Sequence, residues 1–240
     1  MLAETFGLLF AFVALGVWVA NYSGLSGPAL YAATAGVAVL QGCWFHRLYT
    51  VGHEAVHRKM LPDSRLGNDV VGQLLVLPLL IPLPVYRKIH KFHHTHNRRD
   101  HDTSPLDGRV VEDEPGLLRR AWIHLTWYVG VFLGGYFLHG VISILLFLFL
   151  PPKVARKVSP AFEGWTLQEQ LTSMAIFAGG IGLHVGFGWI FGVDAWATAL
   201  GWPLLFFAWI YSLLVYIYHY RTTYGDKVWL NVRSVEASRV

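Results

Sequence analysis

Long apolar runs, separated by short charged stretches, constrain this chain more than any other feature. Of its 240 residues, 54% are hydrophobic and only 14% are charged, whereas soluble domains carry about 25% charged residues. So few charges cannot cover a water-facing surface, and lipid must cover much of it. Runs of about 20 apolar residues are long enough to cross a membrane as helices. The sequence therefore predicts one integral membrane domain over residues 1–240, all-α in class, folded as a polytopic helical bundle.

Four of the apolar runs are predicted to cross the membrane: 6–20, 28–45, 171–190 and 195–218. The run 70–85 is different because Pro78, Pro82 and Pro84 break it. Proline removes a helical hydrogen bond and clashes with the preceding turn. We therefore expect this run to dip into the membrane instead of crossing it.

The run 122–150 is longer than one crossing requires. We expect it to bend at Gly134-Gly135 and to enter and leave on the same side of the membrane. The alternative is a single tilted span, which would place His219 on the opposite side.

The basic residues predict the orientation. All 19 Lys and Arg fall within 47–120, 153–157 and 221–239. Loops rich in Lys and Arg face the cytoplasm. These three stretches and the N-terminus are therefore predicted to be cytoplasmic, with the turn at Asp194 outside. The net charge of +4 thus has a topological explanation, and we expect no nucleic-acid partner. The single Cys43 excludes a disulfide framework and any cysteine-based metal site.

The first of two histidine clusters follows directly from the second predicted span. It contains His46, His53, Glu54 and His57, and we expect it to continue the helix of that span into the cytoplasm. At about 100° per residue, the three histidines fall on one helix face. Histidines at i and i+4, such as His53 and His57, can hold one metal through neutral imidazoles.

The second cluster reads His90-Lys-Phe-His93-His94-Thr-His96, with His101 further on. On a helix, His90, His93, His94 and His101 share a face, while His96 points elsewhere. A solvated basic helix does not need several histidines on one stripe. The pattern therefore predicts metal binding, with His96 and His101 as the weaker candidates.

The number of histidines indicates more than one metal ion. Imidazole ligands suit zinc, copper, iron and nickel, and a structural zinc ion needs only four ligands. The two clusters already supply five strong candidates: His53, His57, His90, His93 and His94. We therefore expect two metal ions at the membrane surface, where an acyl chain could reach them from the bilayer.

The remaining histidines lie in apolar runs. His219 ends the last predicted span, and the predicted topology returns it to the face that carries both clusters, which makes it a further candidate ligand. His124, His139 and His184 have no neighbouring histidine, and we interpret each as a hydrogen-bonded histidine within the membrane.

The two clusters resemble the histidine boxes of the membrane fatty acid desaturase and hydroxylase superfamily. The resemblance rests on His53-x-x-x-His57 followed by His90-x-x-His93-His94, with a broken apolar segment between them. The acidic and proline-containing residues 100–105 are similar to the stretch that follows the family's second box. Asn231-Val-Arg-Ser-Val resembles the segment that leads into its third box, and the resemblance covers essentially the whole chain.

The resemblance implies an oxidoreductase with a di-iron centre, oxygen as oxidant, a lipid or acyl substrate and an electron donor such as ferredoxin or cytochrome b5. It also implies a cytoplasmic cap that carries the boxes, with His53, His57, His90, His93, His94 and His219 as iron ligands. Acyl desaturation is the expected reaction, and carotenoid or other lipid hydroxylation or ketolation is the alternative. Glu54 would orient a ligand histidine instead of ligating iron.

One departure from the family pattern is that no histidine follows His219, so the third box is missing. We expect a sequence truncated at the C-terminus, which by itself would have little activity. A true end with a degenerate site, a membrane scaffold or a metal-storage protein are the alternatives.

A second alternative is a zinc membrane protease, since His53-Glu54-Ala-Val-His57 is also a H-E-x-x-H motif, with Glu54 as general base. Leu106-Asp107-Gly108 resembles the third-ligand motif of such proteases. This alternative leaves His90, His93 and His94 without a role.

Overall fold

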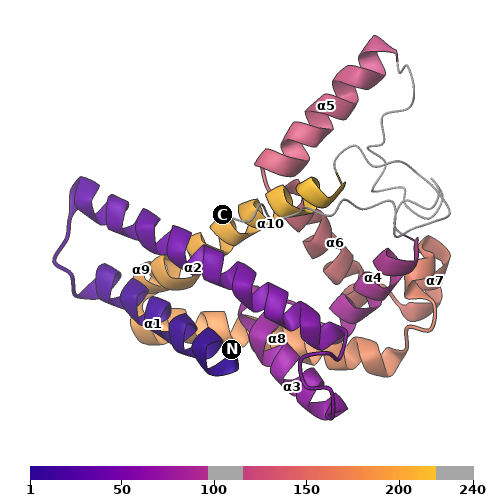
Figure 1. Ribbon diagram of the computed structural model, residues 1–240, viewed down its shortest axis with the longest axis horizontal. Coiled ribbons are helices and arrows are strands. Elements are labelled where there is room, and N and C mark those ends of the chain that lie inside the picture. Colours follow the sequence, from indigo (N-terminus) through magenta and orange to yellow (C-terminus); the bar gives the residue numbers. More distant parts are fainter. Residues whose placement is uncertain (97–115, 220–240) are drawn as a thin grey trace, which may run out of the picture. The chain divides into compact units, whose positions relative to one another are not determined.

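The computed structural model describes residues 1–96 and 116–219, and every regular element among them is helical. The predicted all-α fold class is therefore confirmed for this part of the chain (Figure 1). Two compact units divide the chain. Unit 1 comprises 1–86 and 168–210, and unit 2 comprises 87–167 together with the residues from 211 onward.

Three helical segments are long and apolar enough to cross a membrane. They are α1 (Leu2–Asn21), α8 (Leu167–Phe191) and the segment 193–215, which is built from α9 (Val193–Trp196), the π-helix η3 (Ala197–Gly201) and the start of α10 (Trp202–His219). They coincide with three of the four predicted spans. Large apolar side chains on them are exposed, as in Trp189, which is 90% exposed. This surface suits lipid, because bare apolar surface of this extent is rare in soluble proteins.

The second predicted span lies in α2 (Gly27–Val56), a helix of 30 residues that is not among those three. As predicted, it continues past the apolar run into the first histidine cluster. Glycines let it pack closely. A Cβ on Gly42 would lie 2.9 Å from the carbonyl oxygen of Pro203, and one on Gly52 would lie 2.6 Å from Cγ1 of Val76. The helix is therefore held along its length by its neighbours in unit 1.

The proline-containing run 70–85 forms a sharp bend, as its prolines predicted. Helix α3 (Arg65–Val76) passes into the short 3-10 helix η1 (Leu77–Leu79). The next helix, α4 (Leu83–His96), makes an angle of 95° with the segment Arg65–Leu79. Leu80 adopts a left-handed backbone with φ of 59°, which few non-glycine residues adopt. This bend sets the direction in which α4 carries the second histidine cluster.

Unit 2 contains α5 (Leu117–Phe132), α6 (Gly135–Phe149), α7 (Pro152–Val158) and the 3-10 helix η2 (Pro160–Phe162). Helices α5 and α6 separate at Gly134, whose φ is 72°, so the predicted break at Gly134-Gly135 is confirmed. On which side of a membrane the ends of α5 and α6 lie stays a prediction. The core of the unit is the fully buried Trp165, whose indole N–H donates to the carbonyl oxygen of Phe147 at 3.2 Å.

Candidate metal centre

The first histidine pair sits at the end of α2. His53 and His57 lie one helical turn apart, with ring centroids 4.6 Å apart and ring nitrogens within 4.8 Å of each other. The helix ends at Val56, and Arg58 takes a left-handed backbone with φ of 57°. Two imidazoles at this separation can bind the same metal ion.

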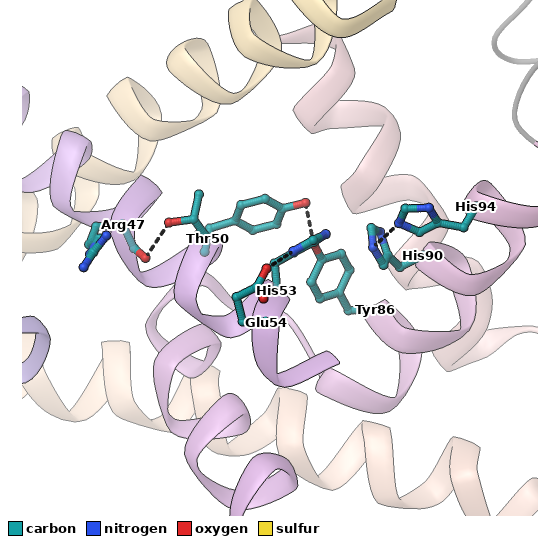
Figure 2. A network of polar contacts seen from close by, with 8 residues as sticks. Arg47, Thr50, His53, Glu54, Tyr86, His90 and His94 are labelled. Carbon is teal, nitrogen blue, oxygen red and sulfur yellow. Dashed lines mark hydrogen bonds and ion pairs between the residues drawn. The ribbon is translucent and has the colours of Figure 1, made fainter. Parts of the chain in front are cut away.

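Glu54 contacts the first of these two histidines. Its Oε1 lies 3.3 Å from Nδ1 of His53 (Figure 2). A carboxylate that accepts from Nδ1 leaves Nε2 as the unprotonated nitrogen that a metal binds. Histidine ligands usually donate their other ring N–H to such a partner. The orienting role of Glu54 stays a prediction.

The environment of the second histidine favours the neutral form. Burial, and then the neighbouring His53 and Lys59, lower the pKa of His57 below its ordinary value, while Glu54 acts in the opposite direction. A neutral imidazole is the form that ligates metals.

The second pair lies on α4. The Nε2 atoms of His90 and His94 are 2.8 Å apart, and their ring centroids are 4.3 Å apart. The ring of His93 is further away, with its centroid 6.4 Å from that of His90 and 6.0 Å from that of His94. His96 turns aside and stacks on Phe92, with ring centroids 4.4 Å apart. The i, i+4 pair is therefore the closest nitrogen pair on this helix.

The first turn of α4 is anchored within unit 1. Leu83 and Tyr86 are buried. The amide N–H of Leu83 donates to Oε1 of Gln73 at 2.8 Å, and the hydroxyl of Tyr86 donates to that of Tyr49 at 2.6 Å. His90 and His94 follow Tyr86 by one and two helical turns, as Figure 2 shows along the helix. The start of the helix that carries the second pair is therefore held within unit 1.

Sequence reasoning missed these anchoring residues. Tyr49 precedes His53 by four positions, and Tyr86 precedes His90 by four positions. A tyrosine one turn before the first histidine of each pair was a visible signal, although their mutual contact was not. Gln73, whose Nε2 also donates to the carbonyl oxygen of Ile81 at 3.2 Å, had no comparable signal.

Four further histidines were singled out in the sequence: His46, His101, His184 and His219. His219 is the last residue of α10, and its side chain lies outside the described residues, as do His101, Leu106-Asp107-Gly108 and Asn231-Val-Arg-Ser-Val. His46, predicted on the face of the first pair, packs against the rings of Tyr49 and Phe207. His184 is buried and hydrogen-bonded within unit 1, as predicted for a histidine in an apolar helix.

An apolar groove of about 570 Å³ opens along α1, and residues of α8, η1 and η3 contribute to its lining. None of the predicted ligands lines it. Its apolar lining suits lipid chains.

The donor set of the two pairs fits a transition metal. All four side chains are imidazoles, which are suitable ligands for iron, zinc, copper and nickel. Magnesium and calcium ions prefer oxygen ligands. Each pair brings its ring nitrogens within 4.8 Å. Either pair could thus provide two ligands of one ion.

Comparison with known proteins gives the family. The family model described as fatty acid desaturase matches residues 27–240. A chloroplastic omega-3 fatty acid desaturase from Glycine max is 27% identical over 221 residues, which are 90% of this chain and 44% of the relative. A ferredoxin-dependent sn-1 acyl-lipid omega-3 desaturase from Nostoc sp. (strain 36) is 28% identical over 195 residues, which are 75% of this chain and 48% of the relative.

An oleoyl-12-hydroxylase from Ricinus communis is also similar, with 31% identity over 71 residues, 30% of this chain and 18% of the relative. The chain spans about half the length of the first two relatives. Because the family model covers the chain from the start of α2 onward, including both histidine clusters, this chain belongs to the fatty acid desaturase family.

Proposed function

We propose that this chain carries the iron-binding histidines of an oxygen-dependent, di-iron membrane oxidoreductase that introduces a double bond into a fatty acyl chain of a lipid. The observation that carries the proposal is the presence of two i, i+4 histidine pairs, His53 with His57 and His90 with His94, each with its ring nitrogens close together. The Glycine max and Nostoc relatives, a fatty acid desaturase and an acyl-lipid desaturase, support the acyl substrate.

The proposed ligands are His53, His57, His90, His93, His94 and His219. We assign both pairs to the di-iron centre because both lie within the residues that the family model matches, at the spacing of the family's first two histidine boxes. Glu54 would hold the ring of His53 through Nδ1.

Iron bound at this site would supply oxygen activation and one-electron transfer. Removal of hydrogen atoms from two unactivated methylene groups requires such chemistry. The reaction removes two hydrogen atoms from neighbouring carbons, so reducing one O2 to two water molecules needs two further electrons from an external donor and two protons from solvent. A ferredoxin or cytochrome b5 is the proposed donor. The chain's own residues bind the iron, orient its ligands and keep water from the acyl chain.

Hydroxylation is the second candidate, and the similarity to the Ricinus communis hydroxylase is the observation that favours it. Desaturation and hydroxylation need the same centre and begin with removal of the same kind of hydrogen atom. Analysis of the lipids made by cells that express the protein distinguishes them, because a hydroxylated chain is heavier by one oxygen atom and a desaturated chain is lighter by two hydrogen atoms.

The metal proposal is tested by counting metal ions in the purified, detergent-solubilised chain after loading with Fe(II) or Co(II). We expect His94→Ala to lower the metal content strongly. We expect His96→Ala, the matched control, to leave it unchanged, because His96 stacks on Phe92. Equal metal content in the two variants would remove His94 from the site.

The proposed topology places the N-terminus and both pairs on the cytoplasmic face. After Cys43, which is exposed, is replaced by alanine, single cysteines are introduced at Arg58, Lys157 or Asp194. An impermeant thiol reagent applied to intact cells should label only the cysteine at 194. Labelling at 157 would mean that the segment containing α5 and α6 crosses the membrane.

A further inference from the structure

Both ring nitrogens of His184, in the C-terminal half of α8, are hydrogen-bonded within unit 1. His184 is only 8% exposed. The indole Nε1–H of Trp196 donates to its Nδ1 at 3.1 Å, and its Nε2 lies 2.9 Å from the carbonyl oxygen of Pro78. An indole nitrogen can only donate, so Nδ1 is the acceptor and Nε2 carries the proton. The ring is thus a neutral donor aimed at one backbone carbonyl.

The carbonyl oxygen of Pro78 lacks the hydrogen-bond donor that a continuing helix would provide. In a continuing helix the carbonyl of residue 78 would accept from the amide of residue 82. Residue 82 is Pro82, which has no N–H. A buried carbonyl without a partner is costly. His184, 106 positions away in sequence, supplies the missing donor.

A second feature of α8 faces the same bend. Gly180 lies one helical turn before His184. A Cβ there would come within 3.0 Å of Cδ2 of Leu80 and 3.3 Å of the carbonyl oxygen of Leu77. Absence of a side chain lets α8 approach the bend closely enough for His184 to reach Pro78. Packing and hydrogen bonding on this face of α8 therefore converge on residues 77–80.

We propose that His184 is a positioning residue, which holds the bend at Pro78–Leu80 and with it the start of α4, the helix that carries His90, His93 and His94. The part that concerns metal binding rests on the proposed function. The mechanical link is short. The bend is followed by Leu83, whose amide is held by Gln73, and α4 runs unbroken from Leu83 to His96. The helix whose start is held in this way is therefore the one that carries the histidines.

Two substitutions of similar polarity separate the hydrogen bond from simple packing. Glutamine can place an amide N–H near the position of Nε2 and so keep the bond to Pro78. Asparagine is too short and can only keep the contact with Trp196. We expect His184→Gln to retain wild-type behaviour and His184→Asn to lose it.

The first measurement is hydrogen exchange of the bend in the full, detergent-solubilised chain without added metal. Peptides covering residues 79–86 should exchange about tenfold faster, or more, in His184→Asn than in wild type or His184→Gln, because local opening no longer has to break the bond. Trp165→Phe is the matched destabilised control. It also removes a bond to a buried carbonyl, that of Phe147, and should leave exchange at 79–86 unchanged.

The second measurement is Co(II) binding, followed by the visible spectrum of the bound ion and by ions per chain. His184→Asn should change the spectrum and lower the affinity, whereas Trp165→Phe should lower the thermal midpoint only. Equal exchange and equal Co(II) binding in the Asn and Gln variants would overturn the proposal.

A wild-type chain that binds no Co(II) would contradict the proposed function. The exchange comparison would still decide whether His184 holds the bend.

Discussion

The ends of α2 and α4 carry equivalent histidine pairs, but the two helices hold them by different means. The last three turns of α2 are buried at Leu48, Val51, Ala55 and Val56. In α4 only the first turn is buried, and the turns that carry the histidines are half-buried or exposed. The first pair is therefore positioned by close packing, and the second pair by anchors at the start of its helix.

The difference matters because the two kinds of support respond differently to substitution. Packed interiors tolerate little added volume, so changes near the first pair should reduce the stability of the whole unit. Hydrogen bonds at the start of α4 contribute less each. Changes there should alter metal binding before they alter the fold.

The largest effect is expected for Gly52→Val in α2. The new Cβ would lie 2.6 Å from Cγ1 of Val76, a fully buried side chain. Overpacking of this kind costs about 1–3 kcal/mol or more. Gly36→Val is the matched control on the same helix, because a Cβ at Gly36 meets nothing within 4 Å. Thermal midpoints in detergent should fall for Gly52→Val and change little for Gly36→Val; similar midpoints would mean that α2 is not held by packing there.

Glu54→Gln should have the next largest effect, on metal affinity. Loss of a carboxylate that orients a histidine ligand lowers metal affinity about 10–100-fold. We expect the lower end, because the Glu54 side chain is 51% exposed. Competition against a chelator measures the affinity. Bound zinc together with an abolished proteolytic activity would instead support the protease alternative, in which Glu54 is the general base.

Tyr86→Phe should have a smaller effect, of about 1 kcal/mol, because it removes one hydrogen bond. The bond joins Tyr86 to Tyr49 at 2.6 Å. Tyr49→Phe removes the same bond. The double variant should therefore bind Co(II) about as tightly as either single variant. Fully additive losses would show that the two hydroxyls act independently and that the anchor is not their contact.

Thr50→Ala should change least. The hydroxyl of Thr50 donates to the carbonyl oxygen of Arg47 within α2 at 3.0 Å (Figure 2). Substitutions without packing or charge consequences stay within about 0.5 kcal/mol. Co(II) affinity and thermal midpoint should match wild type, and a large loss in either would indicate a role for Thr50 beyond its own helix.

The bends were predictable because their causes are local. Pro78 and Pro82 interrupt the helix after α3, and Gly134 permits the positive φ that separates α5 from α6. The pairing of His53 with His57 follows equally from helical periodicity. The sequence was less informative about His93, which shares the stripe with His90 and His94 but lies further from both.

The sequence by itself determined that the long apolar runs are helical, where prolines and glycines break them, and which histidines share a face. Each of these depends on residues a few positions apart, and short-range sterics decide them. Only the tertiary structure decided that Tyr49 meets Tyr86, and that His184 completes the hydrogen bonding of Pro78. Those contacts join residues 37 and 106 positions apart. Helical periodicity carries no information about such distant pairs, because the packing of whole helices brings them together.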